Sequence, residues 1–136
     1  MRRRALDIAL VFCGGSAGTA VRYALTLALP VAAGLPIIFA INVSGAFLLG
    51  MLSARVARAG SSVVAARAWL LVGTGALGGY TTYGTFVADA DGLLDASRFA
   101  EGIVYGLVTV VVGVGAALAG SLVAGRRSAN PDRMNR

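Results

Sequence analysis

The chain has 136 residues, of which 57% are hydrophobic and 13% are charged, about half the charged fraction that a soluble domain needs to cover its surface. Four charge-free runs make up about two thirds of the chain, which is enough for four membrane-spanning helices and excludes a soluble enzyme. The chain has no His and a single Cys, which excludes His/Cys metal clusters, Ser-His or Cys-His nucleophile pairs and an internal disulfide.

The charge-free runs predict an all-α membrane protein, with a single four-helix transmembrane domain over residues 1–125. Its helices are expected at about residues 6–29, 37–54, 68–87 and 99–124. The basic start and the apolar stretch that follows it also fit a signal peptide. A membrane helix is favoured because the stretch continues through Arg22 to Leu29, longer than a signal sequence needs.

Charged residues between the helices set the expected orientation. A loop is expected around Asp89, Asp91 and Asp95, and residues 126–136 are expected to form a disordered cytoplasmic tail. Ten of the 12 Arg fall on the side of the two termini and the loop after the second helix, whereas the other side holds Arg98 alone. This asymmetry predicts a multi-pass protein in the lipid bilayer of the cell membrane, with both termini cytoplasmic. Basic residues that flank spans do not indicate nucleic-acid binding.

The first helix combines small residues with a charge inside the membrane. Gly14 and Gly18 form a GxxxG pair, a spacing typical of close helix packing. Arg22 lies one turn after Gly18 on the same face. Arg22 could snorkel at a helix end. A buried structural or functional role is favoured, because an intramembrane Arg is costly and usually faces protein or water.

The second helix carries a polar side chain in its first half. Asn42 can act as a hydrogen-bonded link between helices, or its amide can donate two hydrogen bonds to an anion in a pore. Both interpretations stay open from the residues alone. Gly45, which follows it, is assigned with Gly18 to structural packing.

The third predicted helix contains five Gly and four Thr within residues 73–86, so an uninterrupted helix is not expected there. Non-helical backbone at membrane depth is tolerated only where it is buried in protein or lines a water-filled path. The charge-free runs contain no carboxylate that could build a cation route. The polar groups present are donors, namely the Asn42 amide and Thr hydroxyls such as that of Thr85, and donors favour a small, hard anion.

Three motifs carry a more specific signal, namely residues 14–23 (GGSAGTAVRY), 42–50 (NVSGAFLLG) and 75–86 (GALGGYTTYGTF). In this order and spacing the chain resembles the CrcB/Fluc family of fluoride channels over all four predicted helices. The resemblance implies a fluoride-selective passive channel, not an enzyme, that exports fluoride from the cytoplasm and lowers its toxicity. It also implies an antiparallel dual-topology dimer with two pores.

The resemblance also implies site residues. Main-chain carbonyls of Gly78 and Thr81 from each subunit would hold a structural Na⁺ at the dimer centre. The helix 1 arginine of the family maps onto Arg22. The side chains implied to line the fluoride path are Asn42, Tyr83, Thr85, Phe86, Tyr105 and Thr109. The chain departs from the family at Tyr83, where Phe is usual, and at Gly84, where Ser is usual, which leaves open whether both pores conduct.

Two other functional classes fit a four-span chain, a small multidrug exporter and a membrane scaffold that transports nothing. The exporter needs a carboxylate within its first span, and this chain has only Asp7 at the start of that span. The dimer has two possible compositions. The arginine asymmetry favours a heterodimer with an oppositely oriented homologue, because a chain that inserts both ways should carry little bias. A homodimer is the alternative.

Overall fold

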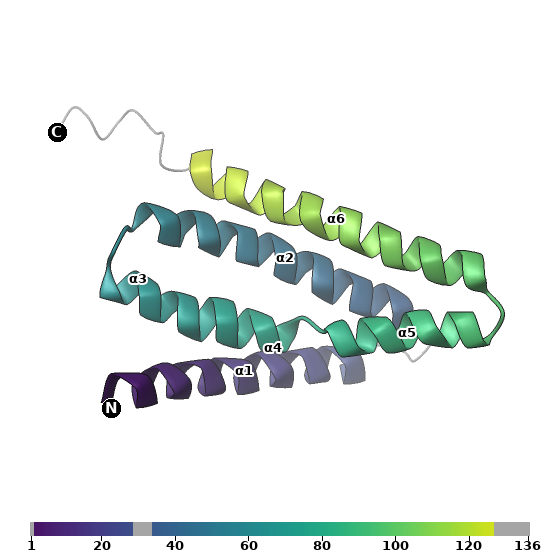
Figure 1. Ribbon diagram of the computed structural model, residues 1–136, viewed down its shortest axis with the longest axis horizontal. Helices are drawn as coiled ribbons and strands as arrows, with labels where there is room; N and C mark the ends of the chain where they lie inside the picture. Colours follow the sequence, from purple (N-terminus) through teal and green to yellow (C-terminus); the bar gives the residue numbers. More distant parts are fainter. Residues whose placement is uncertain (1, 29–33, 127–136) are drawn as a thin grey trace.

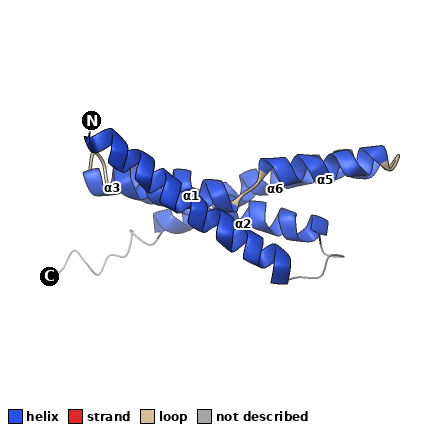
Figure 2. Cartoon of the chain, turned by 90° about the horizontal axis from the view of Figure 1, so that it is seen from below, coloured by secondary structure: helices blue, strands red, loops and turns tan. Residues whose placement is uncertain are grey.

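The computed structural model describes residues 2–28 and 34–126, and all the regular structure in these ranges is helical (Figures 1 and 2). The first, second and last helices are α1 (Arg2–Ala28), α2 (Gly34–Arg58) and α6 (Phe99–Arg126). Between α2 and α6 lie four shorter segments, namely α3 (Val63–Ala68), the π-helical η2 (Trp69–Leu77), α4 (Gly78–Tyr80) and α5 (Tyr83–Asp95).

Four stretches of this structure are long and apolar enough to cross a membrane, as the sequence predicted. They are Arg3–Ala28, Leu35–Arg58, Val63–Asp95 and Phe99–Arg126. The third is composed of α3, η2, α4 and α5 and bends between α4 and α5 (Figure 1). Helical spans satisfy their backbone hydrogen bonds internally, which is what a hydrocarbon environment demands. The chain is therefore an all-helical membrane protein over its described residues.

Most helix ends lie a few residues beyond the expected ones, and two of them change the interpretation of the chain. Helix α2 begins at Gly34, so that Pro36 lies in its first turn, where a missing N–H leaves no hydrogen bond unmade. Helix α5 continues to Asp95, so the expected acidic loop is wrong for all three of Asp89, Asp91 and Asp95. The helix persists because it packs against α6, and Leu93 is buried there. Residues 29–33 and 127–136, including most of the expected tail, lie outside the described residues.

The connection between α5 and α6 is short and turns sharply. Ser97 adopts a left-handed backbone conformation with φ of 59°. Arg98 forms an ion pair with Glu101, which lies in the first turn of the last span. Hydrogen bonding to the Glu101 carboxylate raises the pKa of the exposed Arg98 above its ordinary value. Arg98, like any arginine, is charged at every physiological pH.

Glycine sets how closely the spans approach. A methyl group at Gly14 would overlap the Leu71 carbonyl, and one at Gly18 would overlap the Ala76 carbonyl. The other close pair is α2 with α6, where Gly50 of α2 and Gly120 of α6 meet the backbone of the facing helix. Backbone contact of this kind is how helices associate in lipid, where apolar burial between helices gives little driving force.

Gly18→Ala is expected to destabilise the fold by about 1–3 kcal/mol, because the added methyl group meets backbone atoms that cannot move aside. Gly115→Ala is the matched control, since a methyl group there has nothing within 4 Å, and its effect should stay within about 0.5 kcal/mol. Loss of monodisperse protein on heating in detergent measures both. Equal stability of the two variants would contradict the close packing of α1 against η2.

Candidate functional site at the bend of the third span

The bend is built from two consecutive threonines with extended backbone. Thr81 has φ −74° and ψ 158°, and Thr82 has φ −143° and ψ 121°. The Thr82 side chain caps α5 by accepting a hydrogen bond from the Thr85 N–H at 3.1 Å. The Thr81 hydroxyl donates to the Leu77 carbonyl at 2.9 Å, at the end of the preceding segment. Thr is suited to both roles, because its hydroxyl competes with the backbone for hydrogen bonds.

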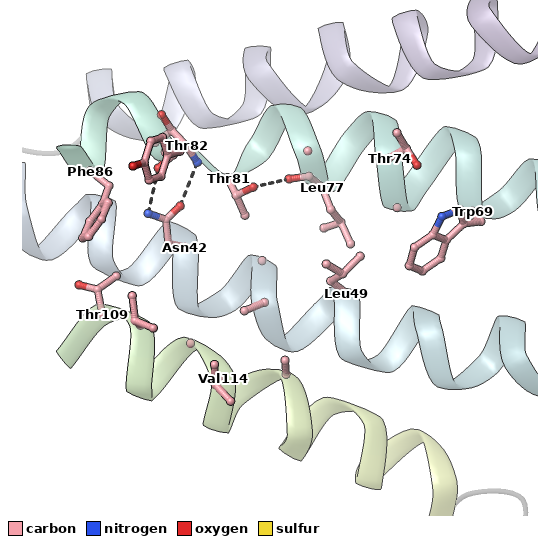
Figure 3. Close-up of a pocket in the computed structure, with 18 residues that line it drawn as sticks. Asn42, Leu49, Trp69, Thr74, Leu77, Thr81, Thr82, Phe86, Thr109 and Val114 are labelled. Carbon is pink, nitrogen blue, oxygen red and sulfur yellow. Dashed lines mark hydrogen bonds between the residues drawn. The ribbon is translucent and has the colours of Figure 1, made fainter. Parts of the chain in front are cut away.

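Asn42 of α2 braces the bend with both ends of its amide. Its Nδ2 donates to the Thr82 carbonyl at 3.1 Å, and its Oδ1 accepts from the Thr82 N–H at 2.9 Å (Figure 3). In a continuous helix the Thr82 N–H would bond to the Gly78 carbonyl. The Gly78 carbonyl therefore loses its helical partner to Asn42. An Nδ2 group has two hydrogens, so one N–H of Asn42 remains for another acceptor.

The other side of the bend is held by α1. The Gly79 carbonyl accepts hydrogen bonds from Arg22 Nε and from Thr19 Oγ1, each at 3.3 Å. Arg22 is half-buried, and its guanidinium thus reaches the backbone of the third span. Gly18 is buried between these contacts and Ala76. Arg22 and Gly18 of α1 therefore both contact the same part of the third span, just before its bend.

A groove of about 700 Å³ runs beside the bend, between α2, the third span and α6 (Figure 3). Most of its wall is apolar or glycine, and none of its lining residues is charged. Five of the predicted site residues contribute side chains to its lining, namely Asn42, Thr81, Tyr83, Phe86 and Thr109. Gly45 and Gly78 also line it. Thr85 and Tyr105 lie outside the groove lining.

Three aromatic rings follow one another from the groove along α5 and α6. The ring centroids of Tyr83 and Phe86 are 6.2 Å apart, and those of Phe86 and Tyr105 are 5.5 Å apart. The two pairs are tilted by 46° and 36°. Tilted rings present positively polarised edges to their surroundings. Tyr83 is 80% exposed, so one end of this series is open.

The series ends at a carboxyl group for which the sequence predicts a loop. Asp89 lies on α5, one turn after Phe86, and approaches Tyr105. Asp89 Oδ2 and the Tyr105 hydroxyl are both buried and have no hydrogen-bond partner among the described residues. The three-residue spacing of Tyr83, Phe86 and Asp89 is a helical signal that would have placed Asp89 on this face.

Comparison with known proteins agrees with the geometry. The family described as "CrcB-like protein, Camphor Resistance (CrcB)" matches residues 9–121. A fluoride-specific ion channel FluC 2 of Leifsonia xyli subsp. xyli is 47% identical over 113 residues, covering 82% of this chain and 78% of the relative. The chain belongs to the CrcB family. A FluC 1 of Ligilactobacillus salivarius (37% identity, 85% and 95% covered) and a FluC of Phenylobacterium zucineum (36%, 86% and 94%) are similar along almost their whole length.

Membership of the CrcB family sets aside the multidrug exporter and the scaffold, and the family is not enzymatic. The resemblance also implies a structural Na⁺, and the described residues show which groups could hold it. No group of three His, Cys, Asp or Glu side chains within the described ranges could hold a metal. Gly78 and Thr81 both line the groove. The Gly78 carbonyl has lost its helical partner, and Thr81 has an extended backbone. Carbonyl oxygens suit a hard alkali cation, so these two residues fit Na⁺.

Proposed function

We propose that this chain forms a fluoride-selective passive channel that lets fluoride leave the cytoplasm. The observation that carries the proposal is the uncharged groove at the bend, whose polar groups converge beside aromatic ring edges. Relatives at 36–47% identity are fluoride-specific ion channels. Fluoride holds its water tightly, so a selective path has to offer donors at close range in place of that water.

The hydrogen bonds already made divide the predicted residues into two groups. The Thr81 and Thr109 hydroxyls donate to carbonyls of their own helices, the latter to Tyr105 at 2.7 Å. Two donors remain for an ion, namely the second N–H of Asn42 and the Thr85 hydroxyl, which accepts from Thr82. The Tyr105 hydroxyl lies near the Asp89 carboxyl, which competes with an ion for its hydrogen. We assign direct fluoride contact to the first two donors and to the ring edges of Tyr83 and Phe86.

The proposed assembly is an antiparallel dimer. The groove is open along one side, Gly78 is exposed, and a methyl group there would meet nothing within 4 Å. A second chain of opposite orientation would cover the groove and bring a second pair of Gly78 and Thr81 carbonyls to the same axis. Four carbonyls would then hold the structural Na⁺, whose charge offsets their aligned dipoles. The ion is assigned to assembly and takes no part in conduction.

The proposed partner is an oppositely oriented homologue rather than a second copy. Apart from Arg22 at the bend and Arg98, the described Arg residues belong to the start of α1, the region of the α2–α3 connection and the end of α6, which lie together at one end of the molecule (Figure 1). Only Arg98 lies at the opposite end among the described residues. By the positive-inside rule this end stays in the cytoplasm, so an antiparallel pair needs a chain of different sequence.

Proteoliposomes that contain the assembled dimer are expected to lose internal fluoride passively and to retain chloride. A fluoride electrode and a chloride electrode measure the two ions from the same vesicles, with protein-free vesicles as the background. The driving force is the imposed ion gradient alone, with a potassium ionophore to balance charge. Efflux of both halides at similar rates would contradict the proposed function.

A further inference from the structure

A second polar cavity lies at the arginine-rich end, far from the bend. Its volume is about 440 Å³, and it lies between the start of α1 and the segment that joins α2 to α3. Arg3 and Arg67 line it together with the hydroxyl-bearing Ser61 and Ser62. Asp7 is its single acidic lining residue. The cavity therefore has a net positive lining and two hydroxyl groups, the side chains that bind phosphate oxygens.

The arginines of this cavity are free to bind an anion. The ion pair found within the described residues is Arg98–Glu101 at the other end, so no described carboxylate pairs with Arg3 or Arg67. Neighbouring Arg4, Arg55 and Arg126 are also exposed and add to the positive field. The Ser62 hydroxyl oxygen accepts from the Ala65 N–H, which leaves its own hydrogen available to donate.

An apolar cavity adjoins the basic one on the membrane side. It has a volume of about 510 Å³ and lies between the end of α2 and the start of the third span. The two cavities share Val56, Ala66 and Leu70 in their linings, and the indole of Trp69 borders the apolar one. Trp is typical of the membrane–water interface. A basic cavity at interface depth that continues into an apolar one matches the two parts of a phospholipid.

We propose that this end of the chain binds one anionic phospholipid. Arg3 and Arg67 hold the phosphate, Ser61 and Ser62 donate to its oxygens, and an acyl chain lies in the cavity walled by Val56, Ala66 and Leu70. The occupant is a lipid rather than free phosphate, because the basic cavity continues into an apolar one that free phosphate would leave empty. Basic pockets between spans are a known way for membrane proteins to hold anionic headgroups.

The test is native mass spectrometry of the full chain in detergent, with 1-palmitoyl-2-oleoyl-phosphatidylglycerol or the matching phosphatidylcholine added. One phosphatidylglycerol is expected to stay bound. Arg3→Gln with Arg67→Gln should weaken its binding about 25-fold, at about fivefold for each arginine. The matched control is Arg55→Gln with Arg126→Gln, which removes the same charge from the same end but lines neither cavity. The control should weaken binding much less, because Arg55 and Arg126 add only to the surrounding field and do not line the cavities.

A second variant tests the acyl chain without changing charge. Ala57→Phe places a ring in the apolar cavity, which Ala57 lines without lining the basic one, and should reduce phosphatidylglycerol binding while glycerol phosphate binding stays unchanged. Equal losses in the two double arginine variants, or equal binding of phosphatidylcholine, would overturn the proposal. Displacement of the lipid by millimolar inorganic phosphate would also overturn it, by identifying a free-anion site. Because lipid binding is read directly, failure here is distinct from failure of fluoride conduction.

Discussion

Asn42→Asp is expected to slow fluoride passage about a thousandfold while the dimer still assembles. The carboxylate keeps an acceptor for the Thr82 N–H, so the contact that holds the bend survives on one side. The aspartate lacks the N–H that donates to the Thr82 carbonyl, and it also lacks the second N–H that we assign to fluoride. It also adds a negative charge to a groove that has none. A like charge at about 4 Å, at an effective dielectric of 20, costs about 4 kcal/mol.

Ser44→Ala is the control for this substitution. Ser44 lies two residues from Asn42 on the same helix, where its hydroxyl contacts the Ile41 carbonyl and the Tyr80 hydroxyl outside the groove. Its loss removes a hydrogen bond near the bend without changing the groove, so efflux should stay within about twofold of wild type. An Asn42→Asp dimer with near wild-type fluoride efflux would remove Asn42 from the conducting path.

The interruption of the third span was predictable because its composition is local. Glycines and threonines disfavour an uninterrupted helix by themselves, so residues 73–86 predict a break without knowledge of any partner. What holds the break was not predictable. Asn42 reaches Thr82 from 40 positions away, and Arg22 reaches Gly79 from 57 positions away. Such contacts depend on how the spans pack against one another. The spacing of residues in a single sequence does not reveal that packing.

The predicted loop position of Asp89 was wrong for a related reason. Three acidic residues in a short stretch resemble a loop, because carboxylates are costly within a membrane span. Helix α5 nevertheless continues, since Leu93 is buried against α6 and the Asp89 carboxyl turns toward Tyr105. The π-helical form of η2 could not be predicted from the sequence either. It places Gly73 and Gly75 in buried positions, and their close contacts come from three different segments of the chain.

Expression of this chain without a homologue is expected to give almost no conducting dimer, and to place the arginine-rich end of nearly every molecule in the cytoplasm. Two single-cysteine variants in a Cys13→Ala background report the orientation. Ser61→Cys lies in the α2–α3 connection and Ser97→Cys in the α5–α6 connection, so they mark opposite ends of the spans. An impermeant maleimide applied to intact cells should label Ser97→Cys and leave Ser61→Cys unlabelled.

This expectation follows from arginine placement and does not depend on how the groove conducts. An antiparallel homodimer needs about equal numbers of both orientations, and a chain with ten Arg on one side and one on the other supplies few inverted copies. Co-expression with a homologue of opposite arginine bias should then restore both the dimer and fluoride efflux. If the chain alone forms a stable, fluoride-conducting dimer with both cysteine positions labelled to half extent, it inserts in both orientations. The groove would then be covered by a second copy of the same chain.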